Sequence, residues 1–91
     1  MSADQQAVAT GADAVARTCQ EYIADVLGIA VENVDRDADF DGLGIDSSLA
    51  VALLGELEER YGVDLPPEAL FENPTINAVA ALVEEQTRPR A

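Results

Sequence analysis

Three segments of the chain place apolar residues three and four positions apart, the spacing that lines one face of an α-helix. We expect helices from Ala12 to Leu27, from about Ser47 to Tyr61, and from Ile76 to about Gln86. Gly28 and Gly62 are suited to end the first two, because glycine tolerates the left-handed conformation found at helix ends. The predicted buried stripes are Val15, Cys19, Tyr22, Ile23, Val26 and Leu27; Ala50, Leu53, Leu54, Leu57 and Tyr61; and Ile76, Val79, Ala80, Leu82 and Val83.

The segments between these helices differ in length and character. Residues 29–46 form a long connection whose irregularly spaced apolar side chains predict a loop anchored on the core at several points. Asp46 or Ser47 is suited to cap the second helix, and Thr75 the last one. Residues 64–74 predict a short helical turn that ends at a proline. The expected fold is all-α, a small four-helix bundle of three main helices and one short third helix. The loop anchors are Val31, Val34, Phe40, Leu43 and Ile45.

The length bounds the organisation. A chain of 91 residues makes one small domain with a modest core. We expect residues 1–11 to be a flexible lead-in, residues 12–86 to form the domain, and residues 87–91 to be a flexible tail.

The charge excludes several partners. The formal net charge is −13, with 18 acidic residues against five basic ones, all of them arginine. Such a chain repels nucleic acid and anionic lipid, and it favours basic partner surfaces. No apolar run reaches the roughly 18 residues of a membrane helix. We therefore expect no nucleic-acid or membrane partner, and a monomer.

Two residue counts narrow the chemistry further. The chain has no histidine, so it lacks the imidazole that activates the nucleophile in Ser-His-Asp and Cys-His enzymes. The single Cys19 cannot form an internal disulfide, and without histidine it makes a zinc site improbable. The N-terminal stretch MSADQQAVAT carries no positive charge ahead of an apolar block, so we do not expect it to be a signal peptide. We expect a reduced, cytoplasmic, non-catalytic protein with no metal site.

The stretch DRDADFDGLGIDSS, residues 35–48, supports two interpretations. Counted from Asp37, the aspartates and the glycine fall at positions 1, 3, 5 and 6 of an EF-hand calcium loop. Position 12 is Ser48 where that loop needs a bidentate glutamate, and no sister loop exists. Weak binding of a cation by Asp37, Asp39 and Asp41 therefore stays as one hypothesis, beside a simple solvated acidic loop.

The second interpretation concerns Ser47. A serine in the first turn of a helix presents its hydroxyl where backbone N–H groups and the helix dipole favour an attached phosphate. Gly42 and Gly44 leave space just before it for an enzyme or a bulky adduct. The plainer alternative is that Ser47 only caps the helix.

The segments LGIDSSLAVALL (43–54) and ELEERYGVDLPPEALFENPTINAVA (56–80) resemble the acyl carrier proteins of fatty-acid and polyketide synthases. The LFENPTI stretch is more similar to the carriers of polyketide synthases than to those of primary fatty-acid synthesis. The resemblance covers about residues 12–85 and implies a four-helix bundle without catalysis of its own. It implies that a phosphopantetheinyl transferase attaches 4′-phosphopantetheine from coenzyme A to Ser47. Asp46 corresponds to the acidic residue that precedes the modified serine in the family, and Gly44 and Leu43 correspond to the residues that lead to it.

The same resemblance implies partners and cargo. An acyl chain would be held as a thioester and passed between ketosynthase, acyltransferase and other synthase or tailoring enzymes. Ser48, where the family often has Leu or Met, adds a second candidate hydroxyl, and Ala52 stands where many relatives have Glu. Peptidyl carrier domains of non-ribosomal peptide synthetases share the fold but usually show Gly-Gly-x-Ser, so an acyl cargo fits better. The expected partner surface is Ser48, Leu49, Val51, Glu56, Phe71 and Glu72.

Overall fold

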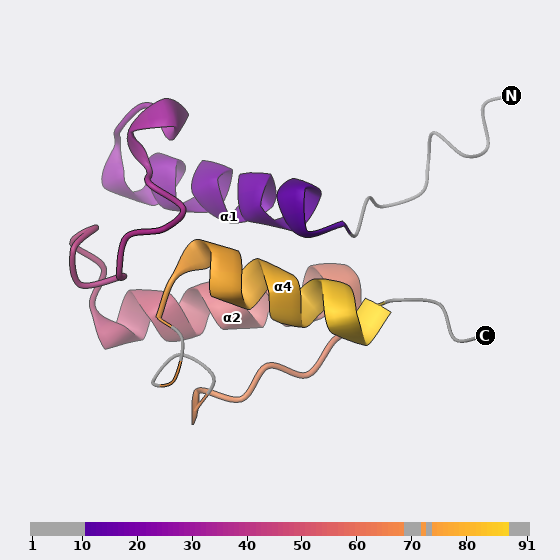
Figure 1. Cartoon of the computed structure of the whole chain (residues 1–91). Helices are drawn as coiled ribbons and strands as arrows, with labels where there is room; N and C mark the ends of the chain where they lie inside the picture. The colour runs from indigo at the N-terminus through magenta and orange to yellow at the C-terminus, as the bar shows by residue number, and fades with distance from the viewer. Residues whose placement is uncertain (1–10, 69–71, 73, 88–91) are drawn as a thin grey trace, which may run out of the picture.

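The computed structural model describes residues 11–68, 72 and 74–87, and these confirm an all-α fold (Figure 1). The main helices are α1 (Ala12–Leu27), α2 (Ser47–Tyr61) and α4 (Ile76–Thr87), and a 3-10 turn, η2, covers Val31–Asn33. The predicted bounds of all three main helices are matched to within one residue. No helix in the described part of the chain has both the length and the apolar character needed to cross a bilayer.

Several expectations fall on parts of the chain outside the described residues. These are the flexible lead-in up to residue 10, residues 88–91 of the tail, and most of the short third helix, including Phe71. Within the expected third helix, Glu68 and Glu72 are helical and exposed.

The helix directions bring the long loop and the start of α4 to one end of the bundle. α1 runs opposite to α2 and α4, and it packs mainly against α4 (Figure 1). The loop between α1 and α2 therefore stays at the end where α2 begins. The connection after α2 returns along the bundle to the same end, where α4 begins. Ser47 thus lies near both the loop and the first turn of α4.

The helices begin and end as the local sequence predicts. Gly28 and Gly62 follow α1 and α2 with φ values of 71° and 67°, the left-handed conformation that side chains disfavour. The Asp46 carboxylate accepts a 2.9 Å hydrogen bond from the Leu49 N–H at the start of α2. The Thr75 hydroxyl accepts a 3.1 Å bond from the Ala78 N–H at the start of α4. These caps satisfy backbone N–H groups that the helix itself leaves unpaired.

The core is built from the predicted stripes, with one correction. Val26 was expected in the buried stripe of α1, but its side chain is 49% exposed. It lies in the last turn of α1, where Ile23 and Ala24 are buried and Leu27 is half-buried on the inner side. Tyr61 is half-buried, and its hydroxyl donates a 3.0 Å hydrogen bond to the Thr18 hydroxyl, which joins α2 to α1. Cys19 is fully buried, as predicted.

The long loop is anchored by apolar side chains at the predicted positions. Val34, Phe40 and Ile45 are buried, and Val31 and Leu43 pack against the core. Each of these contacts removes apolar surface from water, which stabilises the fold by about 25 cal/mol per Å² buried. The loop is therefore ordered although it contains little regular structure.

Polar contacts anchor the same loop to the helices on both sides. The buried Gln20 donates a 2.7 Å bond to the Val34 carbonyl and accepts a 2.9 Å bond from Arg36. The Asn77 backbone N–H donates to the Arg36 carbonyl at 3.1 Å, and its side-chain amide donates to Asp37 at 2.6 Å. We call Gln20, Arg36 and Asn77 the loop brace, since they tie residues 34–37 to α1 and α4.

Candidate functional site

Ser47 is the first residue of α2, and its side chain is exposed. The neighbouring Asp46 provides the capping oxygen, with extended backbone angles and the bond to the Leu49 N–H. The capping role that was the plainer explanation for Ser47 therefore belongs to Asp46. The Ser47 hydroxyl is placed at the helix start and is accessible to a partner.

The start of α2 is an electrostatically suitable place for a phosphate. The Ala50 N–H makes the first bond within the helix, to the Asp46 carbonyl at 3.0 Å, and Asp46 pairs with the Leu49 N–H. The N–H groups of Ser47 and Ser48 precede the first helical hydrogen bond, where the positive end of the helix dipole lies. Together they favour a phosphate ester on the Ser47 oxygen.

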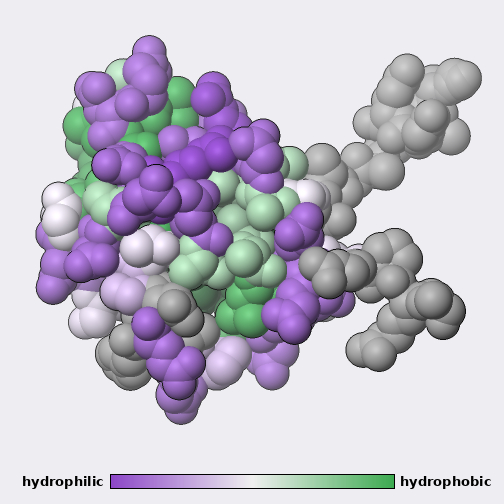
Figure 2. All heavy atoms as spheres, in the orientation of Figure 1, coloured by the Kyte–Doolittle hydropathy of each residue, from purple (hydrophilic) through white to green (hydrophobic). Residues whose placement is uncertain are grey.

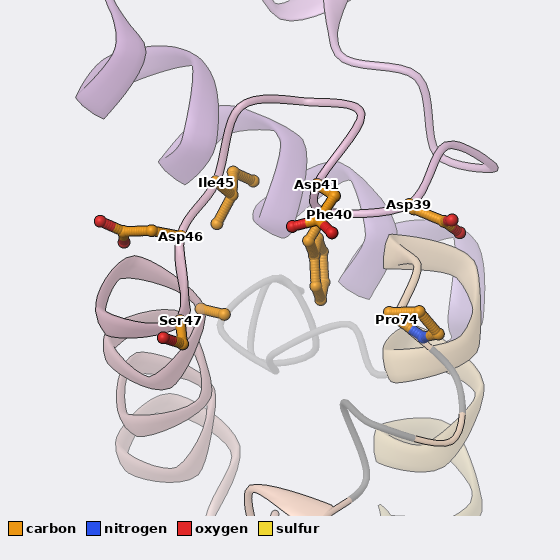
Figure 3. Close-up of a pocket in the computed structure, with 8 residues that line it drawn as sticks. Asp39, Phe40, Asp41, Ile45, Asp46, Ser47 and Pro74 are labelled. Atoms are coloured by element: carbon orange, nitrogen blue, oxygen red, sulfur yellow. The ribbon is translucent and has the colours of Figure 1, made fainter.

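A hollow of about 300 Å³ lies beside Ser47. It separates the first turn of α2 from Pro74, two residues before α4, and the Phe40 ring points into the space between them (Figure 3). We call it the Ser47 hollow. Its lining mixes apolar side chains with carboxylates at the rim: Asp39, Phe40, Asp41, Ile45, Asp46, Ser47, Ala50 and Pro74.

The hollow is assembled by contacts between the long loop and the start of α4. The Phe40 N–H donates a 2.9 Å bond to the Pro74 carbonyl, and an isolated β-bridge pairs Asp39 with Thr75. The Ile45 N–H bonds back to the Phe40 carbonyl at 2.9 Å, which closes the loop into a tight turn before α2. The loop thus presents Phe40 and Asp46 on opposite sides of one turn.

Sequence reasoning missed part of this lining. Phe40, Ile45 and Ala50 were assigned to the core, and the core role is confirmed, but they also face the hollow. Pro74 was predicted only to end a helix. It lies far from Ser47 in the sequence, so no local pattern connects the two residues. The signal available for Ile45 was its position two residues before the candidate serine, and the signal for Phe40 was its place in the loop that leads to that serine.

The two residues proposed to lead into Ser47 shape the loop. Gly44 has a φ of 83°, a conformation that favours glycine, and open space surrounds it. Leu43 is half-buried and packs against the core. A side chain at Gly42 would lie 3.3 Å from the Asp39 carbonyl, so the turn is tight there as well. The direct involvement of Leu43 and Gly44 in attachment stays a prediction.

The aspartate loop uses its carboxylates for hydrogen bonds. Asp35 accepts a 2.9 Å bond from the Asp37 N–H, and Asp37 accepts the bond from the Asn77 amide. Over residues 11–68, 72 and 74–87, no three His, Cys, Asp or Glu side chains gather closely enough to hold a metal ion. The calcium hypothesis gains no support from this arrangement.

Some side chains of the predicted partner surface are exposed, and others contact the rest of the protein. Ser48, Val51 and Glu72 are exposed, and Val51 is 47% accessible rather than packed against the loop. Leu49 is half-buried against the core, and Glu56 pairs with Arg60 at 3.2 Å. The exposed part of the first two turns of α2 therefore carries small or apolar side chains.

Comparisons with known proteins agree with this fold and site. The family model described as "Phosphopantetheine attachment site" matches residues 18–83. The chain is 35% identical over 81% of its length to the conidial pigment polyketide synthase alb1 of Aspergillus fumigatus. It is 41% identical over 72% of its length to the 5-methyl-1-naphthoate synthase of Streptomyces sahachiroi. The chain spans 3% and 4% of the length of these two synthases.

Solved carrier structures share the fold. A free-standing peptidyl carrier protein from an Acinetobacter baumannii secondary metabolic pathway is 31% identical, with a TM-score of 0.74 over 85% of this chain and 98% of that one. The HMG-ACPI domain of the CurA module from Lyngbya majuscula has a TM-score of 0.75 at 18% identity, over 90% of this chain and 84% of that domain. The second likeness concerns the fold alone.

The chain belongs to the phosphopantetheine-binding carrier protein family, and its cofactor is 4′-phosphopantetheine. The start of α2 fits that group. Ser47 offers an exposed hydroxyl, the helix start offers N–H groups that precede the first helical hydrogen bond, and the hollow beside it offers apolar contacts.

Proposed function

We propose that this chain is an acyl carrier of the polyketide type, modified at Ser47 by a phosphopantetheinyl transferase. When bound, the phosphopantetheine arm supplies a terminal thiol on which acyl or polyketide intermediates are carried as thioesters between synthase enzymes. The observation that carries the proposal is the exposed Ser47 hydroxyl at the start of α2, with its neighbour Asp46 acting as the cap.

Each neighbouring group has a part in this proposal. Asp46 holds the first turn of α2 in place, so that the Ser47 oxygen is presented at a fixed position. The Ser47 and Ser48 N–H groups stabilise the negative charge of a phosphate diester on that oxygen. Phe40, Ile45 and Ala50 offer an apolar surface beside the attachment point. The chain itself performs no catalysis in this proposal.

The surface around Ser47 suits synthase partners such as ketosynthases and acyltransferases. Ser48 and Val51 provide an exposed and largely uncharged contact on α2. The net charge of −13 favours approach to a basic partner surface. In this proposal the carrier is a monomer and delivers its acyl cargo in the reduced environment of the cytoplasm.

A peptidyl carrier is the second candidate, because a solved peptidyl carrier is 31% identical. The residues before Ser47 favour an acyl cargo, since Ile45 and Asp46 stand where peptidyl carriers usually have other residues. Loading assays would separate the two. An acyltransferase should load the modified protein with an acyl group from its coenzyme A thioester, whereas an adenylation domain should load a peptidyl carrier with an amino acid.

The modification itself is tested by intact-protein mass spectrometry. We expect wild-type protein incubated with coenzyme A and a broad-specificity phosphopantetheinyl transferase to gain the mass of one phosphopantetheine. Ser47→Ala should gain nothing, and Ser48→Ala should be modified as wild type. An unchanged wild-type mass, with a transferase active on another carrier, would overturn the proposal. Modification lost only in Ser48→Ala would move the site by one residue.

A further inference from the structure

Asn77, the member of the loop brace that lies in the first turn of α4, holds the long loop through both its backbone and its side chain. Its N–H precedes the first hydrogen bond within α4, from the Val79 N–H to the Thr75 carbonyl, and donates instead to the Arg36 carbonyl at 3.1 Å. Its side-chain amide donates to the Asp37 carboxylate at 2.6 Å. The positive end of the α4 dipole favours a carboxylate at this place. One residue of α4 therefore fixes two consecutive residues of the loop.

The loop continues from this contact into one side of the Ser47 hollow. Residues 39–41 belong to the lining of the hollow, and we call them the loop wall. Figure 3 shows Asp39 and Phe40 across the hollow from Ser47. The Phe40 N–H donates to the Pro74 carbonyl at 2.9 Å, so the loop wall also lies against the chain that enters α4. The separation between the loop wall and Ser47 thus depends on how the loop is held on α4.

The opposite side of the hollow is held by other contacts. Ser47 lies on α2, whose first turn is capped by Asp46 and whose residues Ala50 and Leu53 are buried in the core. None of these contacts involves α4 residue 77. A change at residue 77 would therefore displace the loop wall while α2 keeps its place. The space beside the Ser47 hydroxyl would change although the hydroxyl itself does not move.

We infer that Asn77 is a positioning residue for the modification of Ser47. Its amide holds Asp37 and thereby sets the place of the loop wall, past which the transferase and coenzyme A reach the Ser47 hydroxyl. This inference rests on the proposed function, because it concerns the same modification. The other contacts described between the loop and the start of α4 use backbone groups on both sides, so the amide–carboxylate contact is the one that a side-chain substitution can change.

The central variant is Asn77→Asp, which replaces the donating amide with a second carboxylate. The two carboxylates then repel each other across the contact, while the N–H of residue 77 is retained. An acidic residue in the first turn of a helix is favourable, so we expect the variant to fold. The kcat for Ser47 modification should fall about tenfold with KM little changed, because misplaced groups around a reacting centre cost transition-state stabilisation more than binding.

Two further variants separate position from charge. The swap variant Asn77→Asp/Asp37→Asn reverses the hydrogen bond, since the new amide can donate to the new carboxylate, and it should return kcat close to the wild-type value. Asn33→Asp is the matched control, because it adds the same charge as Asn77→Asp at an exposed position. In the part of the chain that the structure describes, the Asn33 side chain makes no hydrogen bond, so this variant should react as wild type.

Nuclear magnetic resonance tests the inferred route without reference to activity. In ¹H–¹⁵N spectra, the amide signals of the loop wall should shift in Asn77→Asp and return in the swap variant. The signals of residues 50–57 in α2 should stay in place in all variants. Thermal unfolding followed by circular dichroism would set a temperature for the kinetic assay at which every variant is folded.

Four outcomes would overturn the inference. These are a wild-type kcat in Asn77→Asp, a lowered kcat that the swap variant does not restore, an equal loss in Asn33→Asp, and a lowered kcat without any shift of the loop-wall signals. A lower unfolding temperature with unchanged kcat would assign Asn77 a structural role only. Failure of the proposed function is seen separately, as a wild-type protein that gains no phosphopantetheine before any variant is compared.

Discussion

At the scale of single residues, Asp46 and Ser47 divide two tasks that either side chain could have performed. Both residue types cap helices well, and both stand at the start of α2. The structure gives the cap to Asp46, whose carboxylate accepts the Leu49 N–H. The hydroxyl next to it is then available for modification without loss of the cap.

Asp46 variants separate its role as a cap from its charge. Asp46→Ala removes the capping oxygen and should lower the free energy of unfolding by about 1 kcal/mol. Asp46→Asn keeps a capping oxygen and should cost clearly less. Urea unfolding followed by circular dichroism would measure both. If Asp46→Asn is as unstable as Asp46→Ala, then the charge rather than the hydrogen bond stabilises this helix start.

At the scale of elements, the loop between α1 and α2 is held by polar contacts as well as by apolar ones. The loop brace joins it to α1 through Gln20 and to α4 through Asn77. Among the described residues, every buried side-chain nitrogen and oxygen has a hydrogen-bond partner. Since the loop carries Phe40 and leads into α2, the brace also keeps the Ser47 hollow in shape.

Truncation of Gln20 tests the brace. Gln20→Ala leaves the Val34 carbonyl and the Arg36 guanidinium without this partner, and it should lower the free energy of unfolding by about 1–3 kcal/mol. Arg17→Ala is the matched control, because it removes only an exposed pair with Glu21, and should change stability by no more than about 1 kcal/mol. Equal losses in the two variants, measured by urea unfolding, would show that the brace adds nothing to stability.

At the scale of the whole molecule, Cys19 reports on the integrity of the bundle. It is fully buried in α1, and burial raises the pKa of its thiol from 9.0 to about 12, while a backbone hydrogen bond and Arg36 act in the opposite direction. The unfolded chain therefore loses this proton at a lower pH than the folded chain does. Stability from this group is complete below pH 9 and falls as the pH rises toward 12.

The reactivity of Cys19 should follow global unfolding. We expect native protein at pH 8 to resist iodoacetamide, since the thiol is both buried and protonated, and protein in denaturing urea to react quickly. Intact mass against time would give the alkylation rate, with Cys19→Ala as the unreactive control. Rapid alkylation of the native protein would mean that the bundle opens around α1 far more readily than its packing indicates.

The sequence by itself determined the three main helices, the glycines that end the first two, the Thr75 cap of α4 and the place of Ser47 at the start of α2, but it left open whether Asp46 or Ser47 caps α2. Each of these depends on interactions within a few residues: helical periodicity, capping bonds and the left-handed conformation of glycine. The local pattern LGIDSS, residues 43–48, was also enough to identify the candidate hydroxyl.

The tertiary structure alone decided which residues from distant segments meet. Pro74 reaches the Ser47 hollow because α4 begins beside the long loop, and Asn77 joins the loop brace for the same reason. Val26 follows the helical period of the core, yet lies exposed at the end of α1. Periodicity predicts which face of a helix is apolar, but only the packing of the other segments determines how far along the helix that face is covered.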